Sequence, residues 1–286
     1  MKVLAFIVTY NRLSSLKRVI ACVQNQTYKL DEIIVVNNNS TDGTAEWLST
    51  VDGISVIHQE NVGGAGGFHT GVKTCYERGA DWIWMMDDDV FPQHDCLENL
   101  LKFKDDSKCL NMTRYWGDGS YVPQNFFFDI NKNYSKSLRA DLSKEYNVVN
   151  TCCFEGLLVS RSIVDKIGFP DERFFIAGDD TIYGYLASFH TNVILVRDAK
   201  AHRLQVNGNV PPRPFYTYYA IRNYFLVNEY KKKITGKGYS LRAWINYYMI
   251  VLKSSIKNAC KGNFDMAKAI LRGCLDGVRN KTGKTY

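Results

Sequence analysis

The sequence of 286 residues lacks the long apolar runs of a membrane-spanning or exported protein. Its longest strongly apolar stretch, residues 243–252, is interrupted by Asn246 and falls well short of the roughly 20 residues that cross a hydrocarbon layer. The N-terminal apolar run, residues 3–8, is shorter than the hydrophobic region of a signal peptide. These absences argue against a channel, and we expect a protein that stays in the cytoplasm.

Proline is scarce, and no cysteines have the spacing of a zinc site. The 6 prolines, 45% hydrophobic residues and 23% charged residues exclude a collagenous or low-complexity chain and are typical of a globular protein. Its length allows one large domain or two smaller ones. None of the 8 cysteines are paired at the two-to-four-residue spacing that chelates zinc, so we expect reduced thiols.

The formal net charge of +7 is unevenly distributed along the chain. Residues 231–286 contain 13 Lys and Arg against Asp265 and Asp276, a net of 13 − 2 = +11, so the first 230 residues carry 7 − 11 = −4. An acidic body therefore carries a basic tail. No recognised nucleic-acid-binding module accompanies this charge, and we expect no nucleic-acid partner.

The first sixty residues alternate between strand and helix patterns. Apolar runs at 3–8, 33–36 and 54–57 predict buried strands, and helical patterns at 13–23 and 44–48 separate them. This order predicts an α/β fold with a parallel sheet, in which ligands bind at the carboxyl ends of the strands. Polar residues follow those ends.

A glycine-rich segment comes next and leaves two interpretations open. It contains Asn61, Gly63, Gly64, Gly66 and Gly67, and a helix is predicted from Gly71 to Arg78. The segment is either a flexible turn or a cradle whose backbone amides meet an anionic ligand. It matches neither the dinucleotide fingerprint nor the Walker A loop.

Three consecutive carboxylates, Asp87, Asp88 and Asp89, end the apolar strand at 82–86. Like charges gathered at a sheet edge are costly unless a cation neutralises them, and oxygen ligands of this kind suit Mg²⁺ or Mn²⁺. A solvated acidic turn is the alternative, but the position directly after a buried strand favours a metal site.

Together these segments resemble the inverting, metal-dependent nucleotide-sugar glycosyltransferases of family 2, which have the GT-A fold. The resemblance covers roughly residues 1–225, and the segments that carry it are 8–12, 35–43, 61–67, 87–89, 154–159, 166–176 and 179–180. It implies a mixed α/β sheet with a C-terminal helical extension. The catalytic domain would span 1–210, with a nucleotide-binding half at about 1–100 and an acceptor half at about 101–210.

The resemblance also implies which residues bind the donor. Asp87 and Asp89 would ligate the metal together with His202, and Asp88 would face the ribose or the donor sugar. Thr9 and Arg12 lie where they can meet the base or the pyrophosphate, and the amide of Asn37 can accept from a uracil or thymine N3–H. The remaining candidates for nucleotide-sugar binding are Asn11, Asn39, Asn61, Gly63, Gly64, Gly66 and Gly67.

The adjacent carboxylates Asp179 and Asp180 match the paired acidic motif that holds the family's base. A like-charged neighbour raises the pKa of one member of such a pair. We favour Asp180 as the base and Asp179 as its orienting or acceptor-binding partner. The pair can equally cap the helix predicted at 182–187. Ile182 stands where the family usually has an acidic residue, which leaves the acceptor open.

Prolines at 211, 212 and 214 mark a boundary before a helical, basic region at 211–286. Apolar residues recur there at helical spacing, at Leu241, Trp244, Ile245, Tyr248, Leu252 and Ile256. A second helical segment is predicted at 264–278. Either these helices pack on the catalytic domain with a solvated basic side, or they dock on anionic lipid.

The expected function is therefore transfer of galactofuranose from UDP-galactofuranose to a surface-polysaccharide or lipid-linked acceptor. The transfer would occur with inversion, at the inner face of the cell membrane. A rhamnosyltransferase that uses dTDP-rhamnose is the enzymatic alternative. An inactive protein that only binds sugar nucleotides is the alternative of another class.

Overall fold

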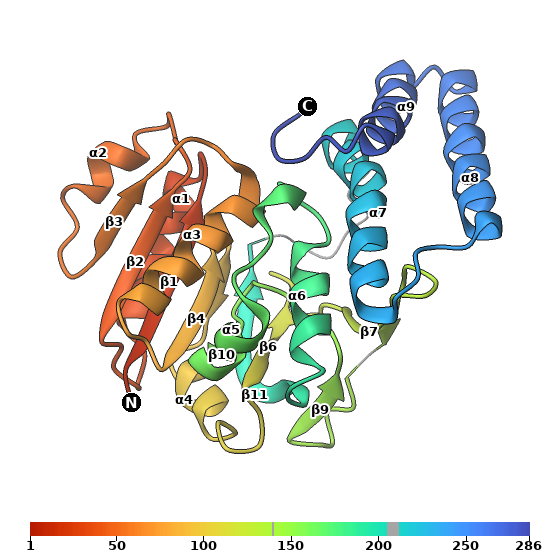
Figure 1. Ribbon diagram of the computed structural model, residues 1–286. Helices are drawn as coiled ribbons and strands as arrows, with labels where there is room; N and C mark the ends of the chain where they lie inside the picture. The colour runs from red at the N-terminus through yellow and green to blue at the C-terminus, as the bar shows by residue number, and fades with distance from the viewer. Residues whose placement is uncertain (139, 205–211) are drawn as a thin grey trace.

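The computed structural model describes residues 1–138, 140–204 and 212–286 (Figure 1). The strands are β1 (Val3–Thr9), β2 (Glu32–Asn37), β3 (Ser55–His58), β4 (Trp82–Asp87), β5 (Val90–Pro92), β6 (Cys109–Tyr115), β7 (Gln124–Asp129), β8 (Tyr134–Leu138), β9 (Tyr146–Val149), β10 (Leu158–Ser160) and β11 (Val193–Arg203). The helices are α1 (Leu13–Gln24), α2 (Thr44–Leu48), α3 (Gly63–Glu77), α4 (Cys96–Leu101), α5 (Arg161–Ile167), the short 3₁₀ helix η1 (Glu172–Phe174), α6 (Asp179–Ala187), α7 (Pro214–Thr235), α8 (Leu241–Cys260) and α9 (Phe264–Val278).

A nine-stranded mixed sheet forms the centre of the molecule. Its order is β3-β2-β1-β4-β10-β6-β11-β5, with β9 paired to β11. The first four strands in this order are parallel, which confirms the parallel sheet predicted from the β-α-β-α-β pattern. Strand β10 inserts antiparallel between β4 and β6, so the two halves of the chain share one sheet. The α/β architecture is confirmed.

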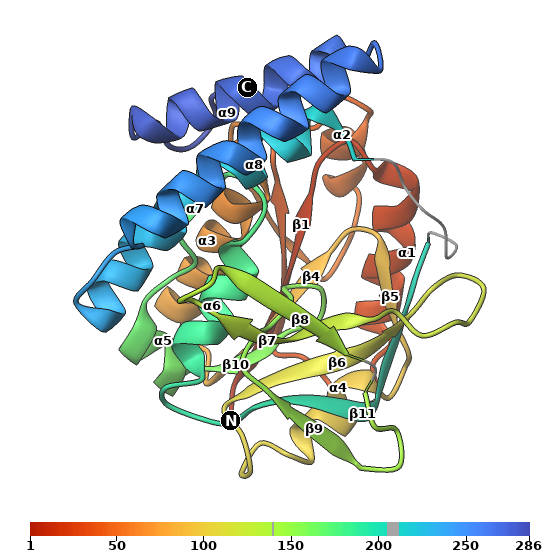
Figure 2. The ribbon, with the colours of Figure 1, turned by 90° about the vertical axis from the view of Figure 1, so that its right-hand side faces the viewer.

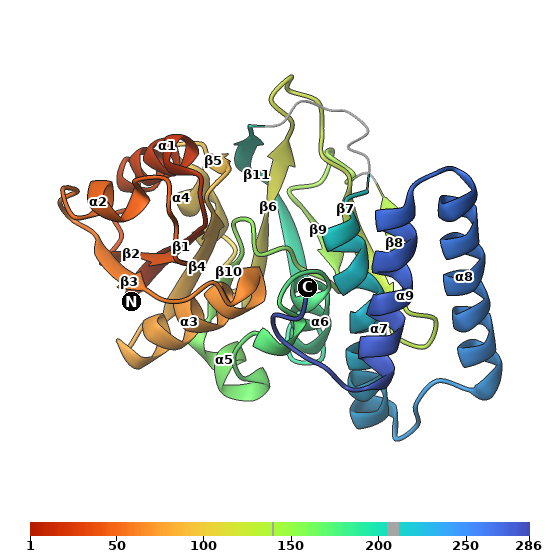
Figure 3. The same cartoon turned by 90° about the horizontal axis from the view of Figure 1, so that it is seen from above.

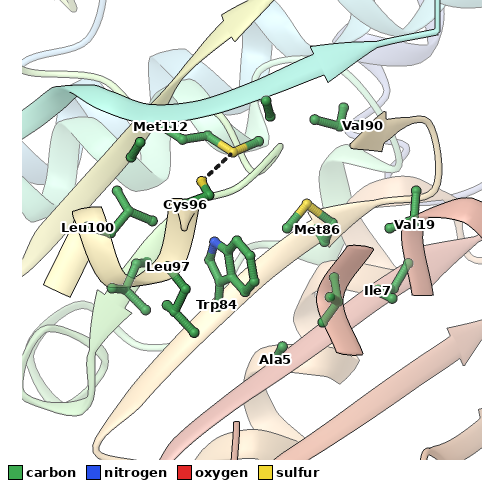
Figure 4. Packing of buried hydrophobic residues seen from close by; sticks show 14 of the residues in the cluster. Ala5, Ile7, Val19, Trp84, Met86, Val90, Cys96, Leu97, Leu100 and Met112 are labelled. Carbon is green, nitrogen blue, oxygen red and sulfur yellow. Dashed lines mark hydrogen bonds between the residues drawn. The ribbon is translucent and has the colours of Figure 1, made fainter. Parts of the chain in front are cut away.

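Strand β1 shows why the sheet is covered on both faces. All seven of its residues are buried, and successive side chains point to opposite sides. Val3, Ala5 and Ile7 belong to a core that includes residues of α1 and α4. Their neighbours on the strand belong to a second core with residues of α3 and α5. Figure 4 shows Trp84 of β4 within the first core, between the side chains of α4 and those of β1.

The glycine-rich segment is helical, so the prediction that the helix begins at Gly71 is wrong. Helix α3 starts at Gly63 and runs along β1. A Cβ on Gly67 would lie 2.5 Å from Cγ1 of Val8, and one on Gly71 would lie 2.2 Å from the ring of Phe6. The glycines let this helix approach the strand closely, which local sequence alone does not indicate.

Three helices follow the sheet domain at its C-terminal side (Figures 1 and 3). Helix α7 packs against α9, and α9 packs against α8. Helix α8 is the farthest from the sheet in both views. The predicted boundary at 210 lies outside the described residues. In the ranges that the structure does describe, no helix is long and apolar enough to cross a membrane.

The small hairpin β7–β8 stands apart from the main sheet (Figure 2). The turn of this hairpin contacts the C-terminal region. The Tyr239 hydroxyl donates a hydrogen bond to the carbonyl of Ile130 at 3.0 Å. Phe128 and Ile130 share a hydrophobic cluster with residues of α6 and α7. The C-terminal helices thus pack against the hairpin and α6.

Candidate active site

A cleft of about 680 Å³ opens at the carboxyl ends of β1 and β4. This is the edge of the sheet at which the sequence predicted a ligand site. The cleft is lined by Val8, Thr9, Tyr10, Arg12, Asn38, Asn61, Gly63, Gly64, Asp87, Asp88, Asp89, Glu155, Phe175, Ile176, Arg203, Phe215 and Tyr216. The chain therefore gathers residues from the first strand and from the start of α7 around one hollow.

Asp88 joins the ends of β4 and β1. Its buried carboxylate accepts hydrogen bonds from the Thr9 hydroxyl at 2.8 Å and from the Tyr10 amide at 3.2 Å. Burial raises the pKa of Asp88 to about 6, although Arg12 and Thr9 act to lower it. With these bonds made, Asp88 holds the loop after β1 in place, in addition to any contact with a ligand.

The carboxylate of Asp87 is buried among other negative charges. Burial raises the pKa of Asp87 well above its ordinary value, and the carboxylates of Glu155 and Asp89 add to the shift. Arg12 donates to Asp88 at 3.1 Å and also to Asp89, and so offsets part of this negative charge. A divalent cation at Asp87 would relieve the repulsion that remains.

Glu155 also lines the cleft and is paired with two arginines. It accepts from Arg203 at 2.7 Å and from Arg114, whose guanidinium also donates to the Cys153 thiol at 3.0 Å. Burial acts to raise the pKa of Glu155, but the two arginines outweigh it and hold the pKa below its ordinary value. Glu155 is therefore an anion that is already neutralised.

The structure does not bring His202 to the acidic triplet. His202 and Arg203 are consecutive residues of β11 and point to opposite sides. Arg203 reaches the cleft and Glu155, whereas the His202 ring lies 5.7 Å from the ring of Tyr115 and 3.3 Å from the amide nitrogen of Gln93. Across the described ranges, no three His, Cys, Asp or Glu residues are arranged to hold a metal.

The carboxylates nevertheless have the chemistry that a hard divalent cation requires. Asp87 and Asp89 both line the cleft, and oxygen donors of this kind are the usual ligands of Mg²⁺ and Mn²⁺. Such ions are commonly held by one or two carboxylates together with substrate phosphates. The protein therefore fits a metal that shares its ligands with a bound diphosphate, but it does not supply a complete set.

Three of the predicted asparagines support the loops beside the cleft. Asn37 is buried, with its Oδ1 accepting from the Ser40 amide at 3.0 Å. Asn11 accepts from the Thr41 amide at 2.7 Å, and Asn39 is exposed with a φ of 61°. None of these three is among the described residues that line the cleft. Their neighbour Asn38, which sequence reasoning did not single out, does line it.

The glycines divide in the same way. Gly63 and Gly64 line the cleft with Asn61, whose side chain accepts from the Gly63 amide at 3.0 Å. Gly66 and Gly67 lie farther into α3, where added Cβ atoms would meet Val62 and Val8. The structure thus places Gly63 and Gly64 at the cleft, and Gly66 and Gly67 in the packing of the helix.

A second pocket of about 250 Å³ adjoins the cleft and contains Asp179 and Asp180. The two hollows share Gly64, Asp87, Glu155, Ile176 and Tyr216. Because Asp87 lines both, the acidic pair lies next to the triplet, as a base must lie next to the reacting centre.

Asp179 and Asp180 are the first two residues of α6, and Gly178 is the N-cap, so the prediction that the pair caps this helix is wrong. Burial, followed by the charge of Asp180, raises the pKa of Asp179 to about 7. Burial also raises the pKa of Asp180, whose carboxylate accepts from the Thr181 amide at 2.6 Å. Burial thus raises the pKa of both carboxylates.

The loop that leads to this pair has an unusual backbone. Phe175 and Ala177 have φ values of 63° and 74°, in the left-handed region that non-glycine residues seldom adopt. Asn223 of α7 donates through Nδ2 to the carbonyls of Phe174, Ile176 and Ala177 at 3.1, 2.9 and 2.9 Å. The side chain of one buried asparagine thus binds three carbonyls of the strained loop.

Two further groups complete this support. Arg222, which is 1% exposed, donates through Nη2 to the carbonyls of Arg173 and Phe174 at 2.8 and 2.7 Å. The Ala65 amide of α3 donates to the Phe175 carbonyl at 3.0 Å. All four carbonyls from 174 to 177 are therefore hydrogen bonded, and α3 and α7 together hold the loop. We call Arg222 and Asn223 the α7 clamp.

Sequence reasoning missed several residues of the site, and two of them had a detectable signal. Glu155 lies within a segment that carried the family resemblance, and Arg203 directly follows His202. Phe215 and Tyr216 also line the cleft, and they come from a helix about 125 positions after the triplet. Only the tertiary structure brings that helix to the cleft.

The open α/β sheet thus presents an acidic triplet at its strand ends, with a second carboxylate pair in the adjoining pocket. The family model for Glycosyl transferase family 2 matches residues 5–168. The chain belongs to this family, and the resemblance read from its motifs is confirmed.

Curated relatives include the galactofuranosyltransferase GlfT1 of Mycolicibacterium smegmatis. It is 29% identical over 188 residues, which make up 62% of this chain and 62% of that protein. The dTDP-rhamnosyl transferase RfbF of Shigella flexneri is 23% identical over 293 residues, covering 98% of this chain and 96% of that protein. The match thus spans less than two thirds of the galactofuranosyltransferase and nearly all of the rhamnosyl transferase.

Solved structures with the same fold include S. aureus TarS 1-349 in complex with UDP, with a TM-score of 0.56 and 15% identity, covering 79% of this chain and 65% of that one. Another is GalNAc-T7 with UDP, GalNAc and Mn²⁺, with a TM-score of 0.60 and 15% identity, covering 80% of this chain and 48% of that one. These neighbours confirm the GT-A fold.

Proposed function

We propose that the protein transfers galactofuranose from UDP-galactofuranose to a hydroxyl of a surface-polysaccharide or lipid-linked glycan, with inversion. The observation that carries this proposal is the joined pair of hollows, in which Asp87 lines both the cleft and the pocket of Asp179 and Asp180. A donor in the cleft would have its diphosphate at the triplet and its sugar facing the carboxylate pair. The similarity to a galactofuranosyltransferase supports the choice of sugar.

In this reaction Asp180 takes the proton of the acceptor hydroxyl. The acceptor oxygen forms a bond to the anomeric carbon while the bond from that carbon to the β-phosphate oxygen breaks, and the nucleoside diphosphate leaves. Asp179 orients Asp180 or the acceptor. Arg12 and Arg203, which line the cleft, supply positive charge near the leaving diphosphate.

Asp87 and Asp89 would hold Mn²⁺ or Mg²⁺ in the ternary complex with the donor. The bound ion would neutralise charge on the leaving diphosphate. The presence of Mn²⁺ with UDP in the GalNAc-T7 structure supports this assignment. Because His202 faces away from the cleft, we assign it no part in this site.

The rhamnosyltransferase alternative has support of its own, since the dTDP-rhamnosyl transferase RfbF covers 98% of this chain. We expect purified protein, given a panel of nucleotide sugars, to release UDP from UDP-galactofuranose faster than dTDP from dTDP-rhamnose. Nucleotide release would be measured with and without acceptor. Faster release from dTDP-rhamnose would transfer the assignment to the alternative, and no release from any donor would favour the inactive binding protein.

The metal assignment makes a prediction about binding as well as about activity. With UDP present, Mn²⁺ should raise the melting temperature by several degrees, because a ligand at about 100 times its Kd adds roughly 2.7 kcal/mol to folded-state stability. Asp87→Asn should abolish this increase, whereas the exposed control Asp105→Asn should retain it. Full activity in excess EDTA would contradict the assignment of Asp87 and Asp89.

A further inference from the structure

The outer surface of α8 carries an apolar strip that no part of the described structure covers. Its six side chains are 42% to 77% exposed: Leu241, Ile245, Tyr248, Met249, Leu252 and Ile256. They recur at intervals of three and four residues, so they share one side of the helix, which we call the α8 strip. An exposed apolar surface of this extent on one helix marks an interaction site.

The α8 strip is distinct from the face through which the helix packs. Trp244 contacts Tyr224 of α7, and Tyr247 donates a hydrogen bond from its hydroxyl to the Ile221 carbonyl at 2.9 Å. Ser255 donates to the Ala267 carbonyl of α9 at 3.2 Å. Because the helix is already anchored by these residues, the strip is not needed to hold it on the domain. Trp244, which recurs at helical spacing with the strip residues, lies at the border of the two faces, because its ring also stacks on that of Tyr248 at 5.8 Å.

Basic residues border the strip. Arg242, Lys253 and Lys257 are all exposed, and they follow the strip along one flank of the helix. The tail from 231 to 286 has a net charge of 13 − 2 = +11, and one of its two acidic residues, Asp276, is buried and paired with Lys281 at 2.9 Å. The tail that carries the strip is therefore strongly basic, and Asp265 is its other acidic side chain.

We propose that the α8 strip and its basic flank dock on an anionic membrane surface, with the helix lying in the plane of the interface. The strip extends over 15 residue steps, or about 22 Å of helix, which suits a helix lying along the interface. Figures 1 and 3 show α8 at the outer edge of the molecule, where a flat surface can reach it. Anionic headgroups complement the lysines and arginine.

A second copy of this chain is a less suitable occupant. A symmetric contact through the strip would bring two basic flanks together, and like charges in such a contact oppose association. Docking on lipid gives the proposed function its location, because a lipid-linked acceptor is held at the same surface. Only this link to a lipid-linked acceptor rests on the proposed function. The exposure and charge of the strip do not depend on which sugar is transferred.

Vesicle flotation with the full-length protein tests the proposal. We expect binding to vesicles containing about one third phosphatidylglycerol and weak binding to phosphatidylcholine alone. Ile245→Glu combined with Leu252→Glu should lower the bound fraction by about tenfold, because both carboxylates would enter the interface. The control is Val148→Glu: Val148 is 50% exposed but lies on β9 of the sheet domain and not on α8, so its replacement should leave binding unchanged.

Two outcomes would overturn the proposal. One is equal flotation of the wild type and the Ile245→Glu, Leu252→Glu variant. The other is a dimer in lipid-free solution that this variant converts to a monomer, which would assign the strip to a second copy. Nucleotide release from the donor with a water-soluble acceptor should be the same in all these proteins. If no nucleotide release were measured in any of these proteins, the wild type included, the result would count against the proposed function and not against membrane docking.

Discussion

Asp180→Asn is expected to lower kcat by about 10²- to 10⁴-fold, the contribution usual for a general base. The amide is nearly the same size as the carboxylate, and the Thr181 amide that donates to Asp180 can still donate to the amide oxygen. Donor binding should therefore change little. Measurements of kcat and of the donor KM by nucleotide release in the presence of acceptor would show the loss almost entirely in kcat.

Asp179→Asn is the comparison that assigns the two roles. Asp179 has a pKa raised to about 7, and the charge of Asp180 is one of the causes. A base with a raised pKa is protonated and inactive at low pH, and burial raises the pKa of Asp180, so the rate should rise with pH as Asp180 loses its proton. Removing the neighbouring charge in Asp179→Asn should move this rise to lower pH while leaving more activity than Asp180→Asn. A greater loss in Asp179→Asn would reverse the assignment.

The α7 clamp carries the second large prediction. Asn223→Ala removes the side-chain hydrogen bonds to the Ile176 and Ala177 carbonyls, while the Phe174 carbonyl keeps its bond from Arg222. Each buried carbonyl left without a partner costs about 1 to 3 kcal/mol. The melting temperature should fall. At temperatures well below melting, kcat should fall by at least about tenfold, because the loop leads directly into Asp179 and the proposed base Asp180. The donor KM is measured as well, since Phe175 and Ile176 of the same loop line the cleft.

The control for this effect lies on the same helix. Asn228 also bonds through its side chain to backbone, accepting from the Tyr239 amide at 2.7 Å, but it supports the turn between α7 and α8. Asn228→Ala should lower stability without changing kcat. Arg222→Lys should retain part of the activity that Arg222→Met loses, since lysine keeps the charge but not the forked geometry. Wild-type kcat in Asn223→Ala would show that α7 does not position the base.

Much of the nucleotide-binding half could be predicted from local patterns. The apolar runs of β1, β2 and β4 are buried throughout or nearly so, and this signal does not depend on distant parts of the chain. The carboxyl ends of parallel strands share one edge of a sheet, so the predictions at Thr9, Arg12 and Asp87 followed from the strand order alone. All three line the cleft.

Other expectations depended on which way a residue faces or on what packs against it. His202 and Arg203 differ by one position in a strand, and that step exchanges the two sides of the sheet. The glycine run has the composition of a loop, and the sequence does not show that β1 packs against it. In the folded protein the missing side chains let α3 approach β1 closely. No local pattern contains either fact.

By itself, then, the sequence determined the α/β class, the family, the acidic triplet and the carboxylate pair, since each of these lies in a contiguous segment with its own pattern. It also determined that a basic helical tail follows. The tertiary structure alone decided that Arg203 replaces His202 at the cleft, that the α7 clamp holds the loop of the base, and that the α8 strip faces outward. These features are made by residues tens to more than a hundred positions apart, and the contacts between them exist only after the chain has folded.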